Sequence, residues 1–365
     1  ADIPPASGVL YDVLLDDQPE PGDYAILRGE PVSFNVMEAP RAHFGMALSG
    51  SFSLLAGGTS VAETELEFLD ALQWFSNTNT LDPVNADLQE RGPLGDTRVA
   101  SINETQILVL PSGSGAFFFD MAVADPENRI TDVRLHTGAG PRSALVSLPG
   151  MGAMVIGGEA DGEPQSAVTL VGDDGELTPL ELSTPRAGAT AAAMGTSVLV
   201  VGGNELGDAE MLVDGASIGI PVASLMDAVR EGGVLVGDGS TRALLVGGVD
   251  GDGALRRDTV DFEACSSVDS CAASPGPDWA TARLEAILPE RSTLLIGGTD
   301  SKLVEEVRWL DDAVDIAPLL ELEGARASAG AIVLESGAFI VGGGEDGGVA
   351  LDDFEYCVPA ELPTF

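Results

Sequence analysis

The chain has 365 residues, and its 59 acidic residues against 17 lysines and arginines give a formal net charge of −42. Such a surface repels the phosphates of nucleic acids and of anionic lipids, so we expect no nucleic-acid partner and no membrane insertion. No apolar run approaches the roughly 18 residues that a membrane-spanning helix needs. The 46 glycines without a collagen period indicate many turns between short strands.

Residues 1–40 contain three short apolar runs, VLYDVLL, DYAIL and VSFNVM. We expect these residues to provide closing strands for the rest of the chain, and Pro31–Met37 to form the strand that completes the last unit. The three runs also fall where the second, third and fourth strands of an additional unit would lie. An eighth unit is therefore an alternative.

From residue 41 onward, a short apolar run followed by two glycines recurs along the chain. The first residues of the pairs are separated by 55, 45, 45, 45, 50 and 45 residues, if Ser112 and Gly113 are taken as a degenerate pair. This period predicts seven units of one kind, with insertions where the step is longer. The pairs are Gly57–Gly58, Gly157–Gly158, Gly202–Gly203, Gly247–Gly248, Gly297–Gly298 and Gly342–Gly343.

An arginine precedes every pair by 14 to 17 residues, which gives a second landmark in the same register. A catalytic arginine would not recur in every unit. We therefore expect a structural role, in which each guanidinium bonds backbone carbonyls or a carboxylate where two units meet. The seven arginines are Arg41, Arg98, Arg142, Arg186, Arg230, Arg283 and Arg326.

One unit illustrates the predicted strands. After Arg186 come the small residues AGATAAAMG, then the apolar run SVLVV that ends at the glycine pair, and then AEMLVDG and SIGIPVAS. Small side chains suit a crowded inner strand, and a continuous apolar run is typical of a strand buried on both faces. Four strands in about 45 residues match one blade of a β-propeller.

The unit resembles a kelch repeat, in which an apolar strand is closed by a glycine pair and aromatic residues follow. Trp279, Trp309 and Tyr356 are similar to those aromatic positions, and the resemblance covers roughly residues 41–357. It implies an all-β protein: a β-propeller of seven four-stranded blades, or eight in the alternative, whose ring is closed by an N-terminal strand. We expect a single domain, with closing strands in 1–40 and the propeller in 41–365.

The three cysteines bear on the compartment. Cys265 and Cys271 lie in one short polar loop, ACSSVDSCAASPG, and we expect them to form a disulfide. A disulfide indicates an oxidising compartment, so we expect a secreted, periplasmic or cell-surface protein. Cys357 is left over and is either buried and free or paired with a partner outside the chain.

The residues that could hold a metal are ambiguous. Asp250, Asp252 and Asp258 follow a glycine pair and could gather oxygen atoms around calcium, but aspartate and glycine also dominate ordinary turns. We expect turns and no cofactor, with calcium as the alternative. Copper radical oxidases also occur on kelch-like propellers, but His43 and His136 fall in different kinds of strand and do not suit one copper ion.

The sequence contains no catalytic motif that we recognise, so we expect no enzyme activity. The favoured function is a non-catalytic propeller that binds a protein or a glycan through loops on one face. One alternative is a carbohydrate-active hydrolase or lyase on the same scaffold. The other is a structural subunit of a surface assembly, joined through Cys357 or an edge strand.

Overall fold

The structure of the chain is a computed structural model. The structure describes residues 24–26, 40–49, 52–58, 69–73, 82–84, 95–112, 115–120, 122–123, 128–135, 142–148, 150–204, 207–213, 216–220, 230, 233–250, 252, 254, 256–265, 270–276, 284–287, 293–298, 301–310, 313–333 and 339–359. These residues form β-strands and turns without an α-helix, which confirms the all-β prediction. In this part of the chain no helix is long and apolar enough to span a bilayer.

The described strands form a series of antiparallel sheets, most of which run in chain order from an inner to an outer strand. The first sheet contains β2 (Gly45–Ser49), β3 (Phe52–Ala56), β4 (Leu69–Gln73) and β5 (Asp82–Val84). The second contains β6 (Thr97–Ser101), β7 (Gln106–Pro111), β8 (Phe117–Asp120) and β9 (Ile130–Asp132). The third contains β10 (Ala144–Leu148), β11 (Gly152–Ile156), β12 (Glu159–Ala160), β13 (Glu163–Val171) and β14 (Leu177–Arg186).

Three more sheets continue the order, and the seventh also takes in the N-terminal strand. The fourth contains β15 (Thr190–Met194), β16 (Ser197–Val201), β17 (Ala209–Val213) and β18 (Ala216–Ile220). The fifth contains β19 (Val234–Gly237), β20 (Ala243–Val246), β21 (Thr259–Glu263) and β22 (Ala272–Pro275). The sixth contains β23 (Leu284–Ile287), β24 (Thr293–Ile296), β25 (Leu303–Leu310) and β26 (Ala313–Glu321). The seventh contains β27 (Gly330–Val333), β28 (Phe339–Gly342), β31 (Phe354–Pro359) and β1 (Tyr24–Ile26), and β29 (Glu345–Asp346) pairs with β30 (Val349–Ala350) beside it.

The core lies between neighbouring sheets. The second strands of the third to seventh sheets are buried along their whole length, because apolar side chains alternate between two faces that are both covered. One cluster joins Met211 of the fourth sheet to Leu245 and Phe262 of the fifth. Each sheet therefore shares its core with the sheets on either side.

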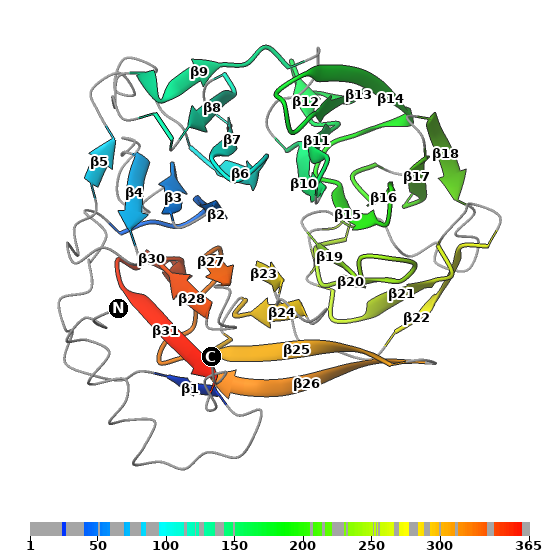
Figure 1. Cartoon of the computed structure of the whole chain (residues 1–365). Coiled ribbons are helices and arrows are strands. Elements are labelled where there is room, and N and C mark those ends of the chain that lie inside the picture. The colour runs from blue at the N-terminus through cyan, green and yellow to red at the C-terminus, as the bar shows by residue number, and fades with distance from the viewer. Residues whose placement is uncertain are drawn as a thin grey trace.

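The first strands of successive sheets contact one another. These contacts run from β2 to β6, β10, β15, β19, β23 and β27, and β27 also contacts β2. Figure 1 shows these strands arranged about a common centre. Backbone hydrogen bonds join the last sheet to the first, from the Gly344 amide to the Arg41 carbonyl (2.7 Å) and from the His43 amide to the Ser328 carbonyl (3.0 Å).

The two ends of the described chain meet in the seventh sheet. Strand β1 pairs antiparallel with β31, with Tyr24 opposite Pro359 and Ile26 opposite Cys357. This strand belongs to the run DYAIL, which the sequence assigned to the third strand of an optional eighth unit. The favoured closing strand, Pro31–Met37, lies outside the described residues.

Candidate functional site

The glycine pairs form the turns that end the second strands. Both residues of the pairs at 57, 157, 202, 247 and 297 have positive φ, the backbone region that favours glycine. Space is also limited: a Cβ on Gly202 would lie 2.4 Å from the carbonyl oxygen of Arg230. In the last unit the prediction was wrong by one residue. Gly342 lies in β28, and the turn is formed by Gly343 and Gly344.

Four of the seven arginines bind the glycine turn of their own unit. The Nη1 atoms of Arg41, Arg186, Arg230 and Arg326 donate to the carbonyl oxygens of Gly57, Gly202, Gly247 and Gly343, at 3.4, 2.7, 3.1 and 2.9 Å. All four arginines are buried. We call each set of arginine, glycine carbonyl and nearby acid a junction, and the expected structural role is confirmed for these four residues.

The other arginines differ. Arg142 forms an exposed ion pair with Glu159 (3.0 Å), and the hydroxyl of Ser143 donates to the carbonyl of Gly157 instead (2.9 Å). Arg98 donates to the carbonyl of Ser143, the residue before the first strand of the next sheet. Arg283 lies outside the described residues.

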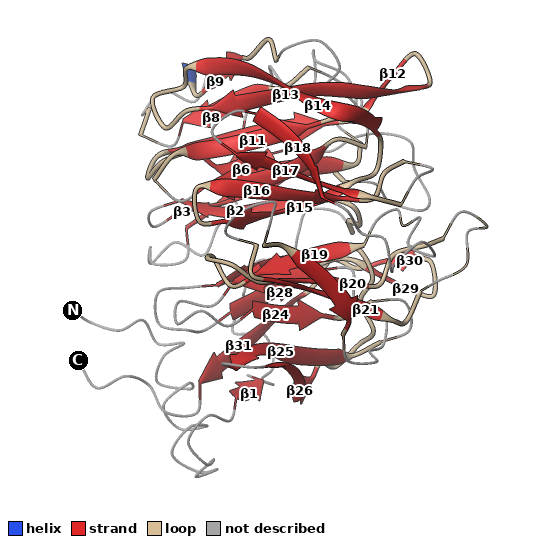
Figure 2. Cartoon of the chain, turned by 90° about the vertical axis from the view of Figure 1, so that its right-hand side faces the viewer, coloured by secondary structure: helices blue, strands red, loops and turns tan. Residues whose placement is uncertain are grey.

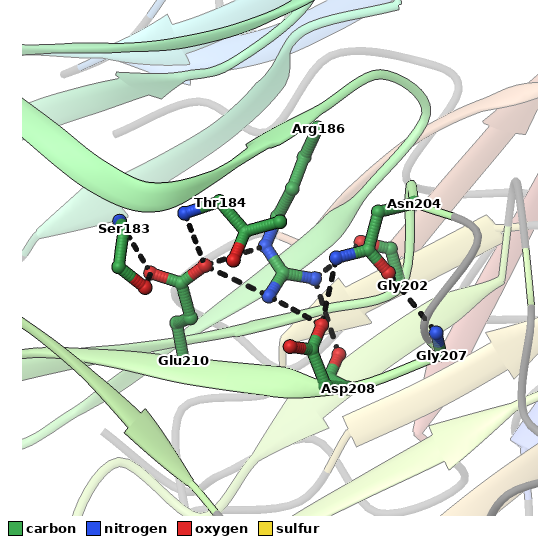
Figure 3. Close-up of polar contacts among 8 residues, drawn as sticks. All are labelled: Ser183, Thr184, Arg186, Gly202, Asn204, Gly207, Asp208 and Glu210. Carbon is green, nitrogen blue, oxygen red and sulfur yellow. Dashed lines mark hydrogen bonds and ion pairs between the residues drawn. The ribbon is translucent and has the colours of Figure 1, made fainter.

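Figure 3 shows the junction of Arg186. Its Nη2 atom lies 2.7 Å from Oδ1 of Asp208 and 2.9 Å from Oε1 of Glu210. Glu210 also accepts hydrogen bonds from the backbone amides of Ser183 (2.8 Å) and Thr184 (3.0 Å) at the end of the outer strand β14. The side chains of Arg186 and Glu210 are 0% and 1% exposed, so one buried ion pair fastens the third sheet to the fourth.

The candidate calcium ligands Asp250 and Asp258 bind different partners. Asp258 binds Arg230 and Arg256, with Oδ1 2.9 Å from Nε of Arg256. Asp250 instead accepts hydrogen bonds from the backbone amides of Asp252 (3.1 Å) and Ala254 (2.9 Å) within its own turn. No group of three or more metal-binding side chains is found in the described part of the chain.

Short hairpins project beyond two of the glycine turns, and Figure 2 shows those containing β12 and β29–β30 on the same side of the molecule. Of the two histidines, His43 is exposed with a φ of 57°, while His136 lies outside the described residues.

The cysteines lie where the chain is densely packed. Cys265 and Cys271 form the expected disulfide, and both are buried against the cluster that joins the fourth and fifth sheets. Cys357 is fully buried between the sixth and seventh sheets, and burial, together with the charge of Glu355, raises the pKa of its thiol. A disulfide from Cys357 to a partner would need an accessible sulfur, and Cys357 is buried.

A polar cluster that we did not predict lies between the fifth and sixth sheets. It consists of Arg242, Asp261, Glu263 and Trp309, and we call it the Trp309 cluster. The guanidinium of Arg242 lies 5.9 Å from the centre of the Trp309 ring and binds Asp261 (2.8 Å) and Glu263 (3.2 Å). The Arg242 and Asp261 side chains are 11% and 8% exposed, whereas that of Glu263 is 51% exposed, so the cluster runs from the interior to solvent.

Oδ1 of Asp261 and Nε1 of Trp309 are buried and have no hydrogen-bond partner among the described residues. Buried polar groups are nearly always paired with protein or water, so an orphaned acceptor and an orphaned donor in one cluster indicate a missing partner. Burial raises the pKa of Asp261, although the hydrogen bond from Arg242 opposes the shift. The Trp309 ring was noticed in the sequence only as a repeat landmark.

The Trp309 cluster adjoins the disulfide loop. The amide of Cys265 donates to the carbonyl of Thr241, the residue before Arg242 (2.7 Å). Asp238 fixes the turn that leads to Arg242, because its Oδ1 accepts the backbone amides of Thr241 (2.8 Å) and Arg242 (3.0 Å). Burial alone would raise the pKa of Asp238, but these hydrogen bonds outweigh it and lower the pKa.

The fold and these sites define an all-β protein of repeated antiparallel sheets held together by buried arginine junctions. Its fold is similar to that of a solved structure described as "Structure of YjhT", with a TM-score of 0.50, 11% identity, and coverage of 88% of this chain and 95% of that one. No protein-family model matches the chain, and no curated protein matches it by sequence. At 11% identity the likeness concerns the fold alone.

Proposed function

We propose that the chain is a divergent kelch-like β-propeller of seven blades that binds a ligand without catalysis. The blade number is supported by the contacts of the seven inner strands and by the backbone bonds between the first and last sheets. The divergent kelch assignment is supported by the repeated glycine turns and their arginines. The disulfide supports a secreted, periplasmic or cell-surface location.

The binding role depends on one observation, the unpaired Oδ1 of Asp261 and Nε1 of Trp309. One atom accepts and the other donates, and a hydroxyl group can do both. The Trp309 cluster therefore suits a hydroxyl-bearing ligand such as a glycan, held near the Cys265–Cys271 disulfide.

The test is a glycan array followed by calorimetry with the best ligand. Trp309→Phe keeps the ring but removes the N–H group, and we expect it to weaken binding about two- to tenfold, the worth of one hydrogen bond. Arg308→Gln is the matched control, because Arg308 is the exposed neighbour of Trp309 and pairs with Glu306. Equal affinities for the two variants, or no glycan bound at all, would overturn this assignment.

The competing function is a carbohydrate-active enzyme, and one observation favours it. Burial raises the pKa of Asp261, and a general acid in glycoside hydrolysis requires such a shift. Incubation with a panel of polysaccharides separates the two functions. Release of reducing ends or unsaturated products that is lost in Asp261→Asn would establish catalysis and refute the non-catalytic role.

A further inference from the structure

A buried acid accompanies the junction arginine in the fourth and seventh sheets. The Nε atom of Arg186 donates to Glu210 (3.2 Å), and that of Arg326 donates to Glu355 (3.0 Å). Each glutamate is the second residue of the third strand of its sheet, counted from the centre. Each also lies opposite the residue two positions before the first turn glycine. This register position can be compared directly between sheets.

The fifth sheet breaks the pattern. The same register position holds an acid in the first and sixth sheets as well. In the third sheet it holds a threonine, and there a serine hydroxyl, instead of an arginine, donates to the glycine carbonyl. The fifth sheet keeps its arginine and has a valine at this position. The residues, in sheet order and leaving out the second sheet, are Asp70, Thr169, Glu210, Val260, Glu305 and Glu355.

The arginine of the fifth sheet is left incompletely paired. Arg230 is 3% exposed, and its Nε atom has no hydrogen-bond partner among the described residues. Its Nη2 atom binds Asp258, which also binds Arg256. Val260 is buried at the place of the glutamate and has two fewer side-chain heavy atoms, so it does not supply the missing carboxylate.

The charges of the junctions differ accordingly. Counted over the described residues that form ion pairs, one arginine with one aspartate and one glutamate gives −1 at Arg186 and at Arg326, whereas two arginines with one aspartate give +1 at Arg230. The pKa values of Arg230 and Arg326 differ in the direction that these charges favour. Burial lowers the pKa of Arg230, which Asp258 only partly offsets, whereas at Arg326 the two carboxylates outweigh burial and raise it.

We propose that a small monovalent anion of the size of chloride binds beside Nε of Arg230, at the place that a glutamate carboxylate takes in the junctions of Arg186 and Arg326, here called the sister junctions. The anion accepts the hydrogen bond that Nε lacks and brings the junction charge from +1 to zero. Because the place is that of a single carboxylate group, the ligand is a small ion. The site is separate from the Trp309 cluster and does not depend on the proposed binding function.

Thermal unfolding in sodium chloride tests this site, with sodium gluconate at equal concentration as the reference. Both salts screen the repulsion within a chain of net charge −42, so only the difference between them reports specific binding. For one site, the folding equilibrium constant rises by the factor 1 + [L]/Kd, so each tenfold rise in chloride above Kd raises it about tenfold. Identical curves in the two salts would overturn the proposal.

Variants locate the effect. Val260→Glu restores the residue of the sister junctions, and we expect it to abolish the chloride-specific stabilisation. Arg256→Gln removes one positive charge and should raise the apparent Kd for chloride, whereas the control Arg308→Gln should leave it unchanged. If Val260→Glu does not fold, Arg256→Gln decides. Chloride dependence that is equal in Arg256→Gln, Arg308→Gln and the parent chain would refute the site.

A second measurement requires no variant. Crystals grown with bromide should give an anomalous peak in contact with Nε of Arg230, because bromide replaces chloride at the same site. Bromide found only at exposed arginines, with none beside Arg230, would show that the ion is adventitious and would overturn the proposal.

Discussion

The Arg186–Glu210 ion pair provides the sharpest test of how the sheets are held together. Replacing Glu210 by methionine keeps the length of the side chain but leaves the guanidinium of Arg186, which is 0% exposed, with only the partly exposed Asp208 as a counter-charge. Removing one partner of a buried ion pair costs about 3–5 kcal/mol. Two backbone amides at the end of β14 lose their acceptor as well. We therefore expect Glu210→Met to lower the free energy of unfolding by about 4 kcal/mol.

The double variant separates the pair from its surroundings. Arg186→Met alone leaves Glu210 buried without its cation, and we expect a loss of about 3–5 kcal/mol. With both residues replaced by methionine no buried charge is left unpaired, so the loss should be no larger than that of Glu210→Met alone. Urea unfolding of the four proteins at equilibrium gives these values, with an unchanged m-value as the sign that the same structure is lost.

The result that would refute this reasoning is additivity. If the two single losses sum to the loss of the double variant, then the two side chains act independently and the junction is not an ion pair in energetic terms. Single losses below about 1 kcal/mol, the range of surface salt bridges, would show that water reaches the guanidinium.

Three further predictions address the turns, the free thiol and the effect of acid. Gly157 has a φ of 59°, and a Cβ there would lie 2.5 Å from a main-chain carbonyl oxygen, so Gly157→Ala should lower the free energy of unfolding in urea by at least about 2 kcal/mol. At Gly115 a methyl group would meet nothing within 4 Å. A similar loss for Gly115→Ala would contradict the argument. The buried thiol of Cys357 should resist an aromatic disulfide reagent until the chain is unfolded, when one thiol titrates, and rapid reaction of the folded protein would disprove its burial. The hydrogen bond from Arg256 is the main cause that lowers the pKa of Asp258 in the folded protein. The ionised Asp258 therefore stabilises the fold above about pH 4, its unfolded pKa, and this stabilisation is lost as the pH falls through the lower pKa of the folded state. Asp258→Asn should lose less stability on acidification than the parent chain, and an equal loss would count against the pairing.

The glycine turns could be predicted because their cause is local. Both residues of the pairs at 57, 157, 202, 247 and 297 have a positive φ, which favours glycine whatever its neighbours, and this requirement is written into the sequence at those pairs. The error at the last pair has an equally local cause. Gly342, Gly343 and Gly344 are consecutive, and nothing in the sequence alone indicates which of the three still belongs to β28.

The remaining features depend on which chain segments become neighbours. Arg98 and Arg142 stand at the right distance from a glycine turn, but distance along the chain does not fix the direction of a side chain, and they bind elsewhere. The Trp309 cluster escaped prediction for a related reason. Arg242 and Asp261 come from one sheet and Trp309 from the next, so no short motif contains all three.

The pairing of β1 with β31 has a mechanical consequence. The strands are antiparallel, and Tyr24 at the start of one lies opposite Pro359 at the end of the other. Tension applied through the two ends of the chain would therefore pull at the same end of this short ladder and unzip its backbone bonds one after another. A force applied at internal loops would leave the pairing of β1 with β31 intact. The direction of the force, and not only its magnitude, therefore decides whether the seventh sheet opens.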